Sequence, residues 1–132
     1  MDEFRLDEIE FHESFLEEGL GCILHTILFL RYPKKIMPAE MSCIQLAPLT
    51  YGKCDSVKID NLVTEQIQLF KEKMKNIGPN LSRGVISLYY FEKKEQPTLL
   101  GFSATMKKKY FEKWELPVIV NHNKFTLALD ES

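Results

Sequence analysis

Apolar residues recur at helical spacing in two long stretches of the chain, and the first stretch predicts a buried helix. From about Phe15 to Arg31, residues at steps of three and four are mostly leucine or isoleucine, and Pro33 ends the pattern. Ser14 followed three residues later by Glu17 predicts a capping box at the helix start. Because the apolar stripe is broad, we expect most of this helix surface to be buried.

The second stretch, "DNLVTEQIQLFKEKMKNIGP", predicts an amphipathic helix. Its apolar residues alternate in steps of four and three. Asp60 or Asn61 is the expected cap, since both side chains accept hydrogen bonds from the first backbone amides. Gly78 and Pro79 mark the expected end.

The rest of the chain has the shorter patterns that are typical of strands. "FRLDEIEF" predicts a first strand that contains a bulge or ends early. Between the helices, "SCIQLAPL" and "SVKI" predict a hairpin or irregular strands. "GVISLYYFEKK" is apolar on both faces, which predicts a strand in the centre of a sheet.

Two further strands, "WELPVIV" and "KFTLALD", are predicted near the C-terminus, joined by the turn "NHN". Pro117 predicts that the first of them lies at a sheet edge or begins late. A loop is expected from about Glu95 to Lys113. These elements predict an α+β fold, a single domain over residues 1–132 with two main helices packed on a mostly antiparallel sheet.

Composition narrows the possible functions. The chain has 132 residues and a formal net charge of −2, so no overall positive field attracts nucleic acid or anionic lipid. Its three cysteines form no CxxC motif, which favours a reducing compartment. The longest apolar run, from Cys22 to Leu30, is much shorter than the roughly 20 residues that a membrane-spanning helix needs. We therefore expect no integral membrane segment.

His25 is the polar residue that stands out within the first helix. Cys22 lies one helical turn away, so both could face one metal, but a zinc site needs three or four ligands and no further candidate lies nearby in the sequence. A reactive cysteine would need an activating environment that this spacing does not supply. We predict that His25 is a buried core or interface histidine, hydrogen-bonded to the backbone, and that the protein holds no metal.

The segment "KKKYFEKW", from Lys107 to Trp114, could bind nucleic acid through charge and stacking. Glu112 and Glu115 dilute its charge, and the alternative is a solvated loop that leads into a buried Trp114. No phosphate-binding loop, nucleophile elbow or HExxH motif is present. We therefore predict neither nucleic-acid binding, nor a cofactor, nor enzymatic activity.

Leu99, Leu100 and Phe102 form an apolar cluster within the expected loop. Loops usually run over the surface, so large apolar residues there indicate either a plug in the core or an exposed anchor for a partner protein. The residues alone leave both possibilities open.

Four segments together resemble one known family. "ILHTILFLR", "NLVTEQIQLFKEKMKN", "ISLYYFEKK" and "EKWELPVIV" follow one another, between about Phe4 and Val120, as they do in the autophagy-related protein 101 family. Members are HORMA-domain subunits of the autophagy-initiation kinase complex. The resemblance therefore implies a HORMA-like α+β fold and a non-enzymatic scaffold.

The family resemblance also implies partners and a binding loop. It implies pairing with the HORMA domain of autophagy-related protein 13, recruitment of downstream autophagy factors, and a cytoplasmic protein that moves to the preautophagosomal structure. Phe102 matches the phenylalanine of the family's Trp-Phe finger, whereas Leu100 and Gly101 stand where Trp and Pro are expected. Leu99, Leu100 and Phe102 are thus the expected partner-binding residues.

One departure from the family concerns the C-terminus. The sequence ends soon after "WELPVIV", whereas the family continues into a third long helix and further strands, so we expect the C-terminal part of the family fold to be missing. A second hypothesis is a HORMA-like adaptor of chromosome or checkpoint signalling, which would bind a peptide by strand addition.

Overall fold

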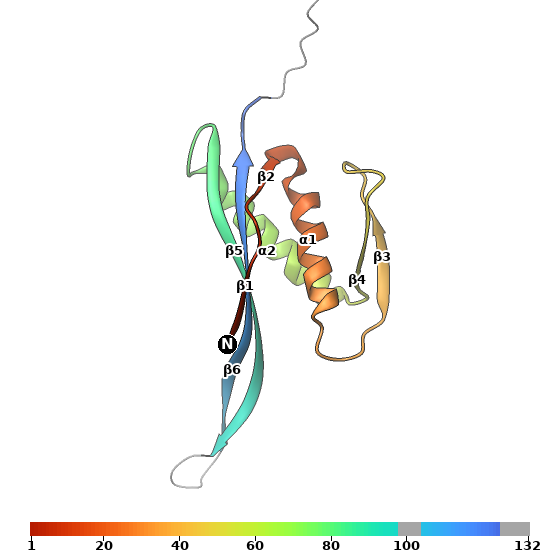
Figure 1. The fold of residues 1–132 in the computed structure, drawn as a ribbon, viewed down its shortest axis with the longest axis vertical. Coiled ribbons are helices and arrows are strands. Elements are labelled where there is room, and N and C mark those ends of the chain that lie inside the picture. Colours follow the sequence, from red (N-terminus) through yellow and green to blue (C-terminus); the bar gives the residue numbers. More distant parts are fainter. Residues whose placement is uncertain (98–103, 125–132) are drawn as a thin grey trace, which may run out of the picture. The chain divides into compact units, whose positions relative to one another are not determined.

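The computed structural model describes residues 1–97 and 104–124 (Figure 1). This part of the chain contains two α-helices, one 3-10 turn and six strands, which confirms the predicted α+β class. The elements in chain order are β1 (Asp2–Arg5), β2 (Ile9–His12), the 3-10 turn η1 (Glu13–Phe15), α1 (Leu16–Leu30), β3 (Pro38–Ser42), β4 (Thr50–Cys54), α2 (Val57–Lys75), β5 (Leu81–Pro97) and β6 (Ala104–Asn121).

The described residues form two compact units. The hairpin unit comprises Met1–Ile9 and Gly84–Val118, and the helical unit comprises Glu10–Arg83 and the chain from Ile119. The long strands β5 and β6 contribute residues to both. Compact units of this kind can belong to one domain, so the single domain over residues 1–132 stays a prediction.

In the helical unit, α1 lies between α2 and the antiparallel β3–β4 hairpin (Figure 1). The apolar stripe of α1 is buried, as its spacing predicts. Residues of α2 and of the hairpin join it in the core. The core side chains of this unit include Leu16, Leu20, Leu24, Ile27, Cys43, Cys54, Val63, Ile67 and Met74.

The predicted capping box of the first helix is wrong. The chain enters α1 through η1, whose cap is His12: its Nδ1 accepts a hydrogen bond from the Ser14 backbone amide at 3.2 Å. Glu17 does not reach back to the helix start, because its carboxylate accepts from Lys71 Nζ at 2.6 Å. The side chain of Glu17, which the motif assigns to the cap, is therefore engaged by an ion pair with α2.

The second helix begins earlier than predicted. Its cap is Ser56, whose hydroxyl accepts a hydrogen bond from the Ile59 amide at 3.3 Å. Asp60 lies inside the first turn, where a carboxylate favours the helix dipole, and pairs with Lys53 Nζ at 2.7 Å. The segment "SVKI" is therefore the start of α2 and not a strand.

A hairpin does precede α2, but its strands flank the segment "SCIQLAPL" instead of containing it. The register pairs Ser42 with Thr50 and Pro38 with Cys54. Most of the residues between the strands form turns, and Ile44 there is 88% exposed. Ile44 and Leu49 of this segment are thus exposed in or beside a turn, and only Cys43 at its start is buried in the core.

The four-stranded sheet has β6 at its centre, in the order β1-β6-β2, with β5 also paired to β6. Two predictions about the sheet are therefore wrong. In the described chain, β5 pairs only with β6 and leaves one apolar face exposed, so it is not the central strand. The strand that contains Pro117 is the central one. The sheet, predicted to be mostly antiparallel, contains the parallel pair of β1 with β6.

Pro117 is accommodated in this central strand where the pairing with β1 ends. The parallel register runs to Arg5 opposite Glu115, and the Leu6 amide then donates to the Glu115 carbonyl at 2.9 Å. The next bond of a parallel ladder would come from the amide of residue 117. Proline has no amide hydrogen, so the ladder stops there.

Three further predictions about strands can be compared with the structure. The first strand is split into β1 and β2, in agreement with the predicted early end. The loop expected from Glu95 to Lys113 is wrong at both ends, because β5 continues to Pro97 and β6 begins at Ala104. The predicted strand "KFTLALD" lies almost entirely outside the described residues.

Neither helix of the described chain is long and apolar enough to cross a membrane.

Two glycines of α1 provide a matched test of this packing. A Cβ at Gly19 would lie 2.3 Å from the ring of Phe11, whereas a Cβ at Gly21 would meet nothing within 4 Å. Gly21→Ala should stabilise the protein by about 0.5–1 kcal/mol, because alanine favours the helix. Gly19→Ala should destabilise it, because the Phe11 ring must move. Chemical denaturation of both variants measures this; equal gains in stability would contradict the packing.

Candidate functional site

The predicted binding residues Leu99, Leu100 and Phe102 lie outside the described part of the chain. The backbone is described on both sides, with β5 running to Pro97 and β6 starting at Ala104. Their role as partner anchors therefore stays a prediction.

The strands that flank this segment carry an exposed aromatic surface in the hairpin unit. Tyr89 is 47% exposed and Phe91 is 40% exposed, and Tyr110 of β6 is exposed beside them. The ring centroid of Tyr110 lies 5.7 Å from that of Tyr89 and 5.5 Å from that of Phe91. Such cross-strand aromatic pairs stabilise a sheet and also present a rigid apolar surface to a partner.

Lysines cover part of this aromatic surface. Lys108 Nζ lies 4.8 Å from the centroid of Phe91, and Lys113 Nζ lies 5.5 Å from that of Tyr89. Lys113 also pairs with Glu115 at 2.7 Å. The segment "KKKYFEKW" is thus part of a strand and not a loop, and its charge is partly neutralised.

Trp114 is half-buried, whereas the alternative interpretation of this segment, a solvated loop, expected a buried ring. Its ring stacks on Phe4 at a centroid distance of 4.7 Å, and its indole N–H donates to the buried Glu112. Phe4 and Trp114 are also register partners in the parallel β1–β6 pair. The tryptophan therefore helps to attach β1 to β6.

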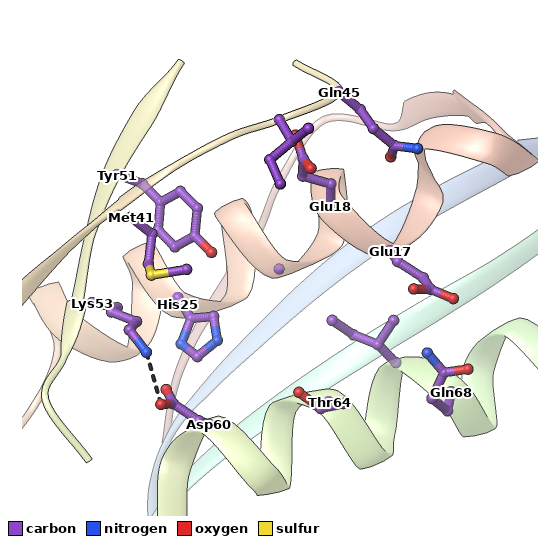
Figure 2. Close-up of a pocket in the computed structure, with 13 residues that line it drawn as sticks. Glu17, Glu18, His25, Met41, Gln45, Tyr51, Lys53, Asp60, Thr64 and Gln68 are labelled. Carbon is purple, nitrogen blue, oxygen red and sulfur yellow. Dashed lines mark hydrogen bonds and ion pairs between the residues drawn. The ribbon is translucent and has the colours of Figure 1, made fainter. Parts of the chain in front are cut away.

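A pocket of about 650 Å³ opens in the helical unit between α1, α2 and the β3–β4 hairpin (Figure 2). Glu18, Gly21 and His25 face it from α1, since steps of three and four residues place them on one helix face. Asp60 and Thr64 face it from α2. Met41, Tyr51 and Lys53 close it from the hairpin.

All three carboxylates that line the pocket have partners within the fold. Glu18 accepts a hydrogen bond from the Leu46 amide at 2.8 Å, which lowers its pKa. Lys71 Nζ likewise lowers the pKa of Glu17. Asp60 uses only one oxygen, because Lys53 contacts Oδ2 while Oδ1 is buried with no partner in the described structure.

His25 is 7% exposed, which confirms that it is buried. Its ring stacks on Tyr51 at a centroid distance of 6.0 Å. Burial lowers the pKa of the imidazole, so the neutral form is favoured. The expected hydrogen bond is missing at one nitrogen, since Nδ1 is buried and has no partner among the described residues. Figure 2 shows the ring between the two helices, with Asp60 near it.

The thiols of the helical unit give no sign of metal chemistry. Cys22, Cys43 and Cys54 are free, and burial raises the pKa of both Cys43 and Cys54. Within the residues that the structure describes, no three histidine, cysteine or acidic side chains are grouped so that they could hold a metal ion.

One polar network has no signal in the sequence pattern. His122 Nδ1 lies 2.7 Å from Glu13 Oε2, and its Nε2 lies 2.8 Å from the Ser82 hydroxyl. This order of groups matches a serine hydrolase triad. Ser82, however, is only 1% exposed and donates its proton to the Met74 carbonyl at 2.6 Å. The serine is therefore neither accessible nor free to act as a nucleophile, and the network is structural.

Comparison with known proteins gives a family match over most of the chain. The family model described as Autophagy-related protein 101 matches residues 8–131. A curated relative, Autophagy-related protein 101 of Arabidopsis thaliana, is 28% identical over 110 residues. The alignment covers 83% of this chain and 49% of the relative, so the chain spans about half the length of the relative it matches.

Burial of His25 predicts a defined pH dependence of stability. Its folded-state pKa lies below the ordinary value of about 6.5, so the unfolded state binds the proton more readily. The contribution of the neutral ring is present above about pH 6.5 and is lost as pH falls through the folded-state pKa. The melting temperature should therefore fall less steeply below pH 6.5 in His25→Gln than in the unmodified protein. Parallel pH profiles would contradict the burial.

Proposed function

The chain belongs to the autophagy-related protein 101 family, and we propose from this membership that it is a non-enzymatic adaptor in autophagy initiation. The family match over residues 8–131 is the observation that carries the proposal. The adaptor pairs with the HORMA domain of autophagy-related protein 13 within the autophagy-initiation kinase complex. It works in the cytoplasm and is recruited to the preautophagosomal structure.

Two features of the hairpin unit support an adaptor role. The aromatic surface of Tyr89, Phe91 and Tyr110 is exposed and held rigid by ring contacts between strands. Exposed apolar surface of this kind is typical of protein interaction sites. The same strands lead directly to the segment that contains Leu99, Leu100 and Phe102, which we propose as the anchor for downstream autophagy factors.

Pairing with a HORMA partner should stabilise the chain. A partner that binds only the native state adds RT ln(1 + [L]/Kd), about 2.7 kcal/mol at a hundred-fold excess over Kd, which raises Tm by several degrees. Differential scanning fluorimetry with and without the HORMA domain of autophagy-related protein 13 measures this. No shift at concentrations where size exclusion shows a complex would contradict the pairing mode, and no complex at all would contradict the pairing.

Truncation of two anchor residues should separate binding from folding. Leu100→Ala combined with Phe102→Ala should abolish capture of downstream factors and leave Tm nearly unchanged, because interface anchors contribute about 2 kcal/mol or more to docking. Leu30→Ala combined with Met37→Ala, which shortens two exposed residues elsewhere, is the matched control.

Two other results for this double variant would give the segment with Leu100 and Phe102 a different role. If the two residues plug the core, the double variant loses several kcal/mol of stability and melts early. Normal capture by a folded double variant would show that the segment does not recruit these factors.

A further inference from the structure

The aromatic surface of the hairpin unit, formed by Tyr89, Phe91 and Tyr110, carries cations over its rings. Lys108 Nζ lies 4.8 Å from the centroid of Phe91, and Lys113 Nζ lies 5.5 Å from that of Tyr89. The ring of Tyr110 contacts both of these β5 rings, at centroid distances of 5.7 and 5.5 Å. The surface therefore combines an exposed apolar centre with two ammonium groups.

The ammonium groups of this surface are not fully neutralised by their neighbours. Lys113 shares the carboxylate of Glu115 with Arg5, so one negative charge serves two cations. Within the described part of the chain, the contact found for Lys108 is with an aromatic ring and not with a carboxylate. The three lysines at 107–109 are all exposed. Positive charge on this strand is therefore available to a partner.

We propose that this surface binds an acidic segment of a partner protein, in which carboxylates flank a large apolar side chain. The carboxylates pair with the ammonium groups over Phe91 and Tyr89, and the apolar side chain packs on the exposed rings. Because each ammonium group already contacts a ring, its lysine side chain has less freedom to lose when the partner binds. That the segment belongs to a partner protein rests on the proposed adaptor function.

Single-stranded nucleic acid and anionic membranes also combine negative charge with flat or apolar groups, but they fit this surface less well. Bases stack on free ring faces, whereas an ammonium group lies over the ring of both Phe91 and Tyr89. Insertion of these rings into lipid would carry the same charges toward the hydrocarbon, which is costly. An acidic segment needs only the ammonium groups and an apolar contact.

The test uses the full chain and a small probe. A fluorescein-labelled peptide with the sequence EDFDE is titrated with the protein at low salt while its fluorescence anisotropy is followed. Two control peptides are QNFNQ, which has nearly the same shape without the charges, and EDADE, which lacks the ring. We expect saturable binding of EDFDE that weakens as salt is added, because salt screens exposed charges. QNFNQ should bind at least about ten-fold more weakly, and EDADE several-fold more weakly.

Variants of two neighbouring lysines distinguish local pairing from general charge. Lys108 and Tyr110 share a face of β6, whereas strand alternation places Lys109 on the other face. Lys108→Met keeps the aliphatic stem without the charge and should weaken EDFDE binding several-fold, whereas Lys108→Arg should retain it. Lys109→Met, the matched control, makes the same charge change and should have little effect. The melting temperature of each variant shows whether it is folded.

The outcomes decide between the possible ligands. Equal binding of EDFDE and QNFNQ, equal losses in folded Lys108→Met and Lys109→Met, or no binding by the folded protein would each overturn the proposal. So would tighter binding of oligouridylate, or of phosphatidylserine vesicles, than of EDFDE, which would assign the surface to nucleic acid or to a membrane. Failure to pair with the HORMA domain of autophagy-related protein 13 would leave the peptide titration unaffected, so the two proposals fail separately.

Discussion

Burial of the apolar stripe of α1 is the constraint on which the helical unit depends. Leu16, Leu20, Leu24 and Ile27 are all buried in this unit, where α1 contacts α2 and β4. Each such side chain contributes about 1.5–3 kcal/mol when it is fully removed from water. Rotating the helix would expose these residues, so its phase is fixed. The same phase turns Gly21 and His25 toward the pocket, and the place of the histidine is thus a consequence of leucine packing.

The existence of both helices could be predicted because their periodicity is long and consistent, but their starts could not. A cap depends on which side chain is free to bond the first amides. Glu17 is engaged by Lys71 from α2, and Ser56 caps α2 because the β4 strand ends just before it. Both arrangements depend on tertiary structure, which the local sequence does not show. A capping motif in a sequence therefore indicates a helix more reliably than it indicates the first residue.

Strand positions were harder to predict, because apolar character does not show which face is buried. In β5, the aromatic residues of one face remain exposed and contact rings of β6 instead of a core. Pro117 predicted an edge strand, yet it lies in the central one, where β1 ends beside it. The candidate site had the same difficulty. His25 can be singled out as a polar residue in an apolar run. The pattern predicts Asp60 or Asn61 only as a cap, because the place of Asp60 in the pocket depends on tertiary packing.

The helical unit contains two sets of polar residues that differ in how completely their atoms are paired. The contacts of His122 with Glu13 and Ser82 form a closed chain: because the serine donates to the Met74 carbonyl, its oxygen can only accept from the imidazole. The hydrogen bond with His122 lowers the pKa of Glu13, which favours its charged carboxylate. A hydrogen-bonded network of this kind holds the segments around Glu13, Ser82 and His122 together.

The pair of His25 and Asp60 is the reverse case, since each retains a buried atom without a partner among the described residues. Both are held in place, one by stacking on Tyr51 and one by its bond to Lys53. Leaving two such atoms unpaired costs free energy of folding, so the stability of the helical unit depends on its apolar core and not on this pair.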